Sequence, residues 1–513
     1  MKAAFRIFLL LGAVIARAAC AAGGPSRCEN AIRVDAAPDY AIFADSGRVA
    51  REIEPEFFGF NLEWIDFQSS LWESAKRRAS PVVSENLNAF PGAVYRYPGG
   101  GAANHFRWHD AVGNADNRPK KSVADWLGPV SPDFGIEEFL AFVQSVGGKP
   151  WFVLNLYGNM DGETDKASLR DSALAWIDDA MSRERAGSPR VLRWELGNEL
   201  DRGPRKSWPP EKYARVASMF GLAINARHPG AKTVVALQDW KAQKSHTVGS
   251  YNRRVIADLK VVSHEFAHHL YFDALPNARD IPHRFSVICQ TLDNARQIGI
   301  ENPLIWITEY GRDIPHPYDS SPWWKNSWPQ TANLQAALGL ADALVLATQI
   351  REIAGMFVHA LATTKGPWPL FHADRNGILR TSVTFQALRL LREGMLPVVL
   401  ETNVRSANAS GYQGGYDHRA TVMTNSARNR FTVWAINRSP GKIQAKLAIA
   451  GMEKRAVAAR HRYLSADTPE ASNYASAGRV TVVDGQPQLS FDASGLATIE
   501  LPPYSVSSFE FAR

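Results

Sequence analysis

In this 513-residue chain, two glutamates lie at the point where an apolar segment is followed by polar residues. Residues 191–199 (VLRWELGNE) end in Asn198 and Glu199, and residues 304–311 (LIWITEYG) turn polar at Glu309. A retaining glycoside hydrolase uses two carboxyl groups, one that protonates the leaving oxygen and one that attacks the anomeric carbon. A lone glutamate at a strand end is more often a surface salt-bridge partner. Two glutamates that each follow an apolar strand, in a fold that brings the ends of these strands together, predict a catalytic pair.

The apolar segments also predict the protonation of the pair. A carboxyl group at the end of a buried strand loses hydration, which favours its neutral form. We therefore expect the pKa of whichever of Glu199 and Glu309 lies in the drier pocket to be raised, as a proton donor requires. In a retaining enzyme the two carboxyl groups should lie roughly 5–5.5 Å apart.

The elements that must position this pair alternate between short apolar strands and helices. Strands are predicted at residues 57–61, 94–97, 151–156, 191–196, 233–237, within 261–272, at 304–308 and at 355–360, and helices at 131–146, 172–181, 210–226, 285–298 and 334–350. Such alternation indicates a parallel sheet with helical crossovers. We predict an α/β fold, a (β/α)8 TIM barrel over residues 55–402. Barrel enzymes carry their catalytic groups at the C-terminal strand ends, here about the fourth strand for Glu199 and the seventh for Glu309.

A second domain is predicted beyond the barrel. Residues 403–418 are rich in Gly, Ser and Asn and are typical of a linker. Residues 418–513 contain short strand-like segments without a convincing helix, which indicates an accessory C-terminal β-sandwich. Residues 29–54 also look like strands, and we expect them to join this sandwich.

The sequence resembles clan A of the glycoside hydrolases, which carries Asn-Glu after the fourth barrel strand and Glu after the seventh. The resemblance extends over nearly the whole chain and is strongest to family 51, the α-L-arabinofuranosidases, with families 79 and 39 as competitors. The matching residues are 58–63 (FGFNLE), 96–100 (RYPGG), 194–199 (WELGNE), 269–271 (HLY), 308–310 (TEY) and 502–506 (PPYSV).

The resemblance implies a role for each matching residue. It makes Glu199 the acid/base and Glu309 the nucleophile of a double displacement. Substrate-binding positions would be Glu63, Arg96, Asn198, His269 and Tyr271; of these, Asn198 would bond the hydroxyl beside the anomeric carbon and Tyr271 would orient the nucleophile. The chain departs from family 51 at Gly101, where an asparagine usually contacts the sugar, and Asn104 is the candidate substitute.

The substrate stays open at this stage. A polysaccharide or oligosaccharide carrying α-L-arabinofuranose is the first expectation. A β-glucuronidase or heparanase-like enzyme is an alternative, because the cationic side chains of Arg312, Lys365 and Arg375 could bind the carboxylate of a uronic acid. A β-xylosidase of the same clan is another. A carbohydrate-binding protein that keeps the fold but has lost catalytic activity is an alternative of a different class.

Residues 264–268 (HEFAH) match the zinc-protease motif H-E-x-x-H. On a helix, this spacing puts two imidazoles on one face to bind zinc, with the glutamate as base. The segment falls where the sixth barrel strand is expected, and a strand would give His264 and His268 different roles. A zinc metalloprotease therefore stays as the alternative, and we expect neither a metal nor another cofactor.

The N-terminus has the pattern of a secretion signal over residues 1–21, with Lys2 and Arg6 before a short apolar run. We expect a secreted or periplasmic protein. Lipid anchoring at Cys20 is not expected, because Arg17 occupies the position that is Leu in a lipoprotein signal. No segment is long enough to span a membrane. The formal net charge is +7 without a basic cluster for nucleic acid. Cys28 and Cys289 could form a disulfide, and the oligomeric state is not indicated.

Overall fold

A computed structural model describes most of the chain. The described residues are 27–120, 133–158, 164–202, 207–239, 247–272, 280–312, 331–362, 368–374, 376–407, 416–474 and 478–513, without the side chains of residues 66, 68, 69 and 280. The expected signal segment, Cys20, Lys365 and Arg375 lie outside this part of the chain.

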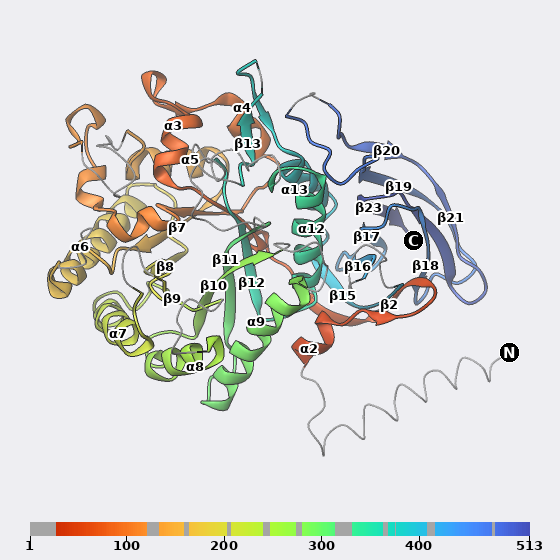
Figure 1. The fold of residues 1–513 in the computed structure, drawn as a ribbon, viewed down its shortest axis with the longest axis horizontal. Coiled ribbons are helices and arrows are strands. Elements are labelled where there is room, and N and C mark those ends of the chain that lie inside the picture. Colours follow the sequence, from red (N-terminus) through yellow and green to blue (C-terminus); the bar gives the residue numbers. More distant parts are fainter. Residues whose placement is uncertain are drawn as a thin grey trace.

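Eight parallel strands close into a barrel, as predicted (Figure 1). In chain order they are β3 (Phe58–Asn61), β6 (Val94–Tyr97), β7 (Lys149–Leu154), β8 (Arg193–Leu196), β9 (Thr233–Ala236), β10 (Glu265–Phe272), β11 (Leu304–Arg312) and β12 (Ile353–Val358). Helices cover such strands from outside while side chains fill the interior, so the strands are apolar and buried nearly throughout.

Helices follow most of the strands and surround the barrel. They are α3 (Trp64–Ser70), α4 (Pro81–Leu87), α5 (Ile136–Ser145), α6 (Lys166–Arg185), α7 (Pro210–Arg227), α8 (Val248–Leu259), α9 (Asp280–Gln297), α12 (Leu334–Thr348) and α13 (Val383–Glu393). Helix α12 is mostly apolar and almost entirely buried, because it packs against strand β11 and also against strands of the second domain.

The second domain is a mixed sheet of eleven strands, built around an apolar core of its own. Its strands are β1 (Asp35–Ala36), β2 (Tyr40–Glu52), β15 (Val398–Ser406), β16 (His418–Thr424), β17 (Arg430–Asn437), β18 (Ile443–Ile449), β19 (Ala456–Leu464), β20 (Val483–Gly485), β21 (Gln488–Ser490), β22 (Leu496–Leu501) and β23 (Ser505–Ala512). Strand β2 lies between β15 and β18, so the N-terminal segment is an interior part of this sheet.

Short elements complete the description. They are the strand pairs β4 (Trp72–Glu73) with β5 (Arg78–Ala79) and β13 (Phe371–Ala373) with β14 (Leu379–Thr381), and the 3-10 turns Pro55–Phe57, Ser74–Lys76, Gly101–His105, Trp108–Ala111 and Ala115–Asn117. Two local expectations are wrong. Residues 29–32, expected as strand, belong to helix α2 (Arg27–Ile32), and β11 does not end before Glu309 but continues to Arg312.

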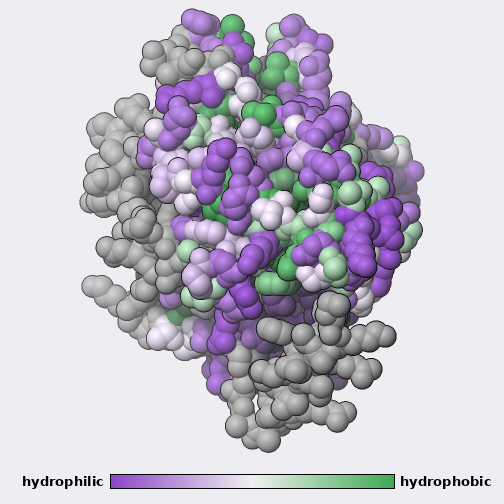
Figure 2. All heavy atoms as spheres, turned by 90° about the vertical axis from the view of Figure 1, so that its right-hand side faces the viewer, coloured by the Kyte–Doolittle hydropathy of each residue, from purple (hydrophilic) through white to green (hydrophobic). Residues whose placement is uncertain are grey.

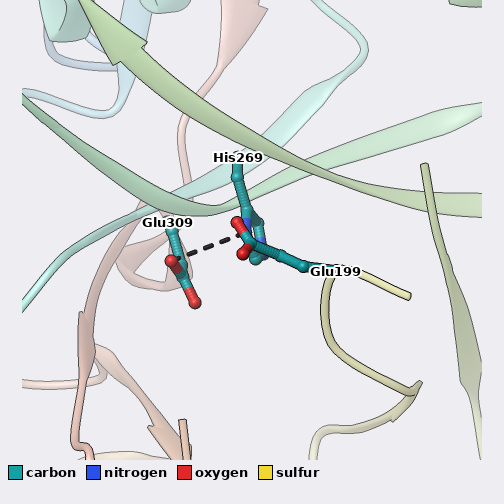
Figure 3. Close-up of side chains that lie close together, drawn as sticks. All are labelled: Glu199, His269 and Glu309. Atoms are coloured by element: carbon teal, nitrogen blue, oxygen red, sulfur yellow. Dashed lines mark hydrogen bonds and ion pairs between the residues drawn. The ribbon is translucent and has the colours of Figure 1, made fainter. Parts of the chain in front are cut away.

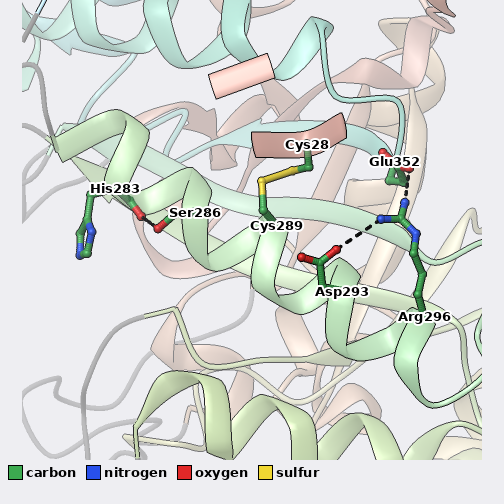
Figure 4. Close-up of a disulfide and its surroundings, with 7 residues drawn as sticks. All are labelled: Cys28, His283, Ser286, Cys289, Asp293, Arg296 and Glu352. Atoms are coloured by element: carbon green, nitrogen blue, oxygen red, sulfur yellow. Dashed lines mark hydrogen bonds and ion pairs between the residues drawn. A yellow bond between two sulfur atoms is a disulfide. The ribbon is translucent and has the colours of Figure 1, made fainter. Parts of the chain in front are cut away.

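Helix α2 is fixed to the barrel by a disulfide between Cys28 and Cys289 (Figure 4). Cys289 belongs to α9, so the bond joins the N-terminal segment to a barrel helix 261 residues further along the chain. Among the described residues, no helix is long and apolar enough to cross a membrane. On the face that carries the second domain, hydrophilic side chains predominate and apolar ones show in small areas between them (Figure 2).

Candidate active site

Glu199 and Glu309 meet at one end of the barrel (Figure 3). Glu199 follows the fourth strand, β8, and Glu309 lies on the seventh, β11. A carboxylate oxygen of each and a ring nitrogen of His269 all lie within 4.8 Å of one another. The side chain of Glu309 is 4% exposed and that of Glu199 is 26% exposed, so one carboxyl is enclosed and the other reaches solvent.

A tight turn after β8 points Glu199 into the site. Glu199 has a φ of +48° and Gly197 a φ of +83°, both in the left-handed region that costs a residue with a Cβ energy. Asn104 fixes this turn: its amide nitrogen donates to the backbone oxygen of Asn198 at 2.7 Å, and its Oδ1 accepts from the backbone N–H of Asn198 at 3.3 Å. Asn104, the candidate substitute for the missing sugar contact, is therefore occupied in holding the turn.

A β-bulge brings His269 and Glu309 to the same place. Along β10 and β11, His268 pairs with Ile307 and His269 pairs with Glu309, which skips one residue of β11. Bulges commonly redirect side chains near active sites. His269 Nδ1 lies 2.8 Å from Glu199 Oε1 and 3.5 Å from Glu309 Oε2, so the imidazole stands between the two carboxyls.

Arg96, on strand β6, is fully buried and is bonded to Glu309 and Asn198. Its five N–H groups are all donated to protein oxygens: Glu195 Oε2 (2.7 Å) and Oε1 (3.0 Å), Asn61 Oδ1 (2.7 Å), Glu309 Oε1 (2.9 Å) and Asn198 Oδ1 (2.7 Å). An arginine has five such donors, so none remains for substrate. In this arrangement Arg96 contacts Glu309 and Asn198, and direct binding of substrate by Arg96 stays a prediction.

The other residues expected to bind substrate lie around Glu309. The Tyr271 hydroxyl donates to Glu309 Oε2 at 2.7 Å, which is the predicted contact. The bond from Arg96 fixes the Asn198 amide, whose NH2 group makes no hydrogen bond within the described part of the chain. Glu63 sits against the cis-Pro turn of residues 96–100: a Cβ on Gly100 would lie 1.7 Å from Glu63 Oε1, so only glycine leaves room for this carboxyl.

The charges around Glu199 outweigh its burial. Burial alone raises the pKa of the Glu199 carboxyl, but Arg202 and His269 stabilise the anion and bring the pKa below its usual value. For His269, burial disfavours the cation, yet the carboxylates of Glu309 and Glu199 raise the pKa of the imidazole above its ordinary value. These shifts favour a protonated His269 beside an ionised Glu199.

The anionic form of Glu309 is stabilised even more strongly than that of Glu199. Burial again raises the pKa of Glu309, but the charges of His269 and Arg96, together with the Tyr271 hydroxyl, hold it far below the usual range for a carboxyl. Burial acts on both carboxyls as expected, but the resulting pKa is lowered for both, whereas the sequence predicts a raised pKa for one of them. Nearby cations and hydrogen-bond donors favour the charged form by more than desolvation disfavours it.

Within the described residues, Glu199, His269 and Glu309 are the group whose side chains could share a metal ion. Their donor atoms already have protein partners. Arg202 and His269 bind Glu199, and Arg96 binds Glu309. Two guanidinium groups beside the pair would repel a divalent cation. We assign the cluster to acid–base chemistry on these contacts.

The HEFAH segment is a strand. Glu265 begins β10 and binds Arg193 (2.6 Å) and Trp306 (2.7 Å) on the outside of the site. His268 is buried and bonded to Thr291 Oγ1 at 3.1 Å, whereas His264 is exposed. The two imidazoles and Glu265 have separate partners and form no cluster of possible metal ligands among the described residues.

Several site residues were missed by sequence reasoning. Glu195 anchors Arg96; His359, which follows β12, lies 3.5 Å from Glu63 and 3.8 Å from Glu309; and Arg202 lies 3.1 Å from Glu199. Each follows or lies in a predicted strand, so position was the available signal. Their partners come from other strands, and no spacing in the sequence marks such pairs.

Comparison with known proteins agrees with this geometry. Residues 86–275 match the family model described as "Alpha-L-arabinofuranosidase 1 domain". The chain is 25% identical over 413 residues to an intracellular exo-α-(1→5)-L-arabinofuranosidase of Streptomyces lividans, a match that covers 74% of this chain and 60% of the relative. It is 31% identical over 180 residues to a probable α-L-arabinofuranosidase C of Aspergillus fumigatus, covering 31% of this chain and 32% of that protein.

The fold is shared with solved structures. The family 51 α-L-arabinofuranosidase AbfB of Bifidobacterium longum superposes with a TM-score of 0.76 at 18% identity, covering 93% of this chain and all of that one. The α-L-arabinofuranosidase of Thermotoga maritima, solved as an arabinose complex, gives a TM-score of 0.75 at 17% identity, covering 93% and 100%. The chain is thus similar in sequence to α-L-arabinofuranosidases, and it shares its fold with solved α-L-arabinofuranosidases of family 51.

Proposed function

We propose that this protein is a retaining α-L-arabinofuranosidase that releases arabinofuranose from an oligosaccharide or polysaccharide. The observation that carries the proposal is the approach of Glu199 and Glu309 to within 4.8 Å at the ends of the fourth and seventh strands. This spacing suits direct attack by one carboxylate, because an inverting pair needs roughly 6.5–9.5 Å to admit a water molecule. The arabinofuranosidases named above support the choice of sugar.

In the first step, Glu309 attacks the anomeric carbon while the bond to the leaving oxygen breaks. The electron pair of that bond goes to the leaving oxygen, which takes a proton from Glu199. Arg96 and Tyr271 hold the two oxygens of Glu309 in place, which reduces the entropy cost of attack. His269 carries the resting proton next to Glu199, so the pair can present a protonated carboxyl when a substrate displaces solvent.

In the second step, water attacks the glycosyl-enzyme and Glu199 takes its proton. Esterification has by then removed the negative charge of Glu309. A neighbouring anion raises the pKa of Glu199, so the loss of that anion lowers it further and favours the carboxylate that acts as base. Glu309 leaves as the free carboxylate, and the sugar is released with retained configuration.

The charges around the pair favour a neutral sugar over a uronic acid. Glu63, Glu199 and Glu309 place three carboxyl groups at the site, and the N–H groups of Arg96 are all used by protein oxygens. Burial lowers the pKa of His359, which favours a neutral imidazole beside Glu309. A uronate would add a fourth anion here, so we place the glucuronidase alternative second.

A panel of 4-nitrophenyl glycosides tests the proposal. Turnover is expected with the α-L-arabinofuranoside and not with the β-D-glucuronide or β-D-xyloside, and NMR of the first-formed product should show retention. Turnover of the glucuronide alone would establish the uronidase alternative. Absence of turnover with all three would favour a binding protein, and chelator-sensitive peptidase activity would favour a zinc protease.

We also propose that the protein is exported. The pattern of residues 1–21 and the Cys28–Cys289 disulfide support this, since structural disulfides are characteristic of oxidising compartments. The S. lividans relative is by its name intracellular, so the two proteins would differ in location. Exported protein that has lost residues 1–21 should contain no free thiol when denatured without reductant. Free Cys28 and Cys289 thiols in protein recovered from its native host would contradict export.

A further inference from the structure

Arg202 connects the fourth and fifth strands of the barrel at the edge of the site. Its Nη1 lies 3.1 Å from Glu199 Oε1 and its Nε lies 3.4 Å from Asp201 Oδ2, while its Nη2 donates to Asp239, the third residue beyond β9. The side chains of Arg202 and Asp239 are 27% and 12% exposed. Ion pairs so placed are weakened by solvent less than surface pairs are.

The donors around Glu199 bind one of its two oxygens. Arg202 Nη1 and His269 Nδ1 both meet Oε1, at 3.1 and 2.8 Å. Among the described residues none forms a hydrogen bond with Oε2, although the carboxyl is 26% exposed. A general acid needs one oxygen within reach of the leaving group and a fixed orientation of the carboxyl plane.

We propose that Arg202 is a positioning residue for this reaction: held by Asp239, it clamps Oε1 of Glu199 together with His269 and leaves Oε2 to carry the catalytic proton. The inference rests on the proposed role of Glu199. The proton on Oε2 passes to the glycosidic oxygen as the bond to the anomeric carbon breaks, and Oε2 later takes a proton from the attacking water. Arg202 itself exchanges no proton and forms no bond to substrate.

The guanidinium group of Arg202 also affects the pKa of Glu199. The groups that face it are Arg202 and Asp201 from the end of β8, Asp239 from the end of β9, His269 from β10 and Glu309 from β11. Arg202 and His269 favour the Glu199 anion and Glu309 opposes it, while Asp201 and Asp239 act through Arg202. Removing the guanidinium therefore raises the pKa of Glu199 and extends its protonated form to higher pH.

The test compares R202M and R202K with wild type in pH profiles of kcat/KM. One substrate is the 4-nitrophenyl α-L-arabinofuranoside and the other an alkyl α-L-arabinofuranoside, whose leaving group needs the proton. In R202M the alkaline limb should move up by about one pH unit, and alkyl glycoside hydrolysis should fall at least about tenfold more than aryl glycoside hydrolysis. R202K keeps the charge, so its limb should stay near that of wild type while alkyl glycoside hydrolysis still falls.

Two further variants complete the design. R254M removes an exposed arginine paired with Asp258 on α8 and should behave as wild type. D239N leaves Arg202 without its anchor and should reduce alkyl glycoside hydrolysis in the same sense as R202M. An alkaline limb of R202M that coincides with wild type, or equal losses on both substrates, would overturn the role of Arg202 while leaving the proposed function intact. A wild-type enzyme inactive on every glycoside would overturn both.

Discussion

Around Glu309, donors from Arg96 and Tyr271 occupy both carboxylate oxygens, whereas the donors around Glu199 meet only Oε1. A carboxylate bonded on both sides and enclosed is fixed for attack in one direction. A carboxyl that keeps one oxygen free and partly exposed can exchange protons with a leaving group and with water. These contacts support the proposed roles of Glu309 as nucleophile and Glu199 as acid/base.

Loss of either glutamate should leave a different chemical signature. Glu309→Ala removes the group that forms the glycosyl-enzyme, so every substrate should suffer. Glu199→Ala removes the proton donor, so alkyl glycosides should lose about 10²–10⁴-fold and a dinitrophenyl glycoside should still be cleaved. Azide needs no base, so it should rescue Glu199→Ala and yield a glycosyl azide of retained configuration, identified by NMR.

The same azide should enter Glu309→Ala from the vacated side and give the inverted azide. The opposite pairing of variant and stereochemistry would mean that the two roles are exchanged. Wild-type rates in both variants would show that these glutamates are not the catalytic pair.

At the scale of the elements, the barrel was predictable because the apolar period of a strand or helix is a local property of the chain. All eight strands and the position of Glu199 after the fourth agree with that pattern. Element ends were less predictable: β11 runs on through Glu309 because its pairing with β10 continues past the bulge. Helix α2 was missed because its position depends on a disulfide to α9, far away in sequence.

The connections between elements were the part that the sequence did not predict. Arg96 was recognised by its motif, but its partner Glu195 lies on β8, 99 residues away. Arg202 meets Asp239, and His269 reaches Glu309 through a bulge that no residue type announces. Such contacts depend on three-dimensional closure of the barrel, so residue spacing carries no signal for them.

The disulfide between α2 and α9 should stabilise the fold measurably. Cross-linking residues so distant in sequence restricts the unfolded chain, and a loss of about 2–5 kcal/mol in the free energy of unfolding is expected for Cys28→Ser. Urea unfolding of the variant, without reductant, measures this. Wild type in dithiothreitol should approach the same value. A variant as stable as oxidised wild type would show that the bond adds nothing to the fold.

At the scale of the whole molecule, barrel and sheet are joined through a buried carboxylate. Asp342 of α12 contacts Arg419 of β16 at 2.7 Å and Arg438, just beyond β17, at 3.0 Å, and accepts a hydrogen bond from Tyr416 at 2.7 Å. All four side chains are buried. Removal of this anion would take a counter-charge from two buried guanidinium groups in the interface.

Asp342→Ala should therefore destabilise the protein by about 3–5 kcal/mol, the usual cost of breaking a buried pair from one side. Asp178→Ala removes a partly exposed partner of Arg227 and His228 and should cost about 1 kcal/mol or less. Urea unfolding followed by tryptophan fluorescence compares the two. A loss in Asp342→Ala no larger than in Asp178→Ala would show that the cluster does not hold the domains together.

Buried neutral histidines should make the whole fold sensitive to mild acid. Burial lowers the pKa of His268 to about 3 and the pKa values of His418 and His461 to about 4. In the unfolded chain an imidazole has a pKa of about 6.5. Between these values the unfolded state binds more protons than the native state, so stability falls as the pH falls below about 6.5.

His268 makes this prediction testable at one site. Between pH 7 and pH 5 the imidazole of His268 is protonated in the unfolded state but stays neutral in the native state. This difference lowers the free energy of unfolding by about 2 kcal/mol. His268→Gln keeps a hydrogen-bonding group near Thr291 but cannot titrate, so its loss of stability between pH 7 and pH 5, measured by urea unfolding, should be smaller than that of wild type by this amount. His264→Gln changes an exposed imidazole four residues earlier and should keep the wild-type difference. If His268→Gln loses as much stability as wild type over this interval, the native state accepts the proton on His268, and the acid sensitivity must arise elsewhere in the molecule.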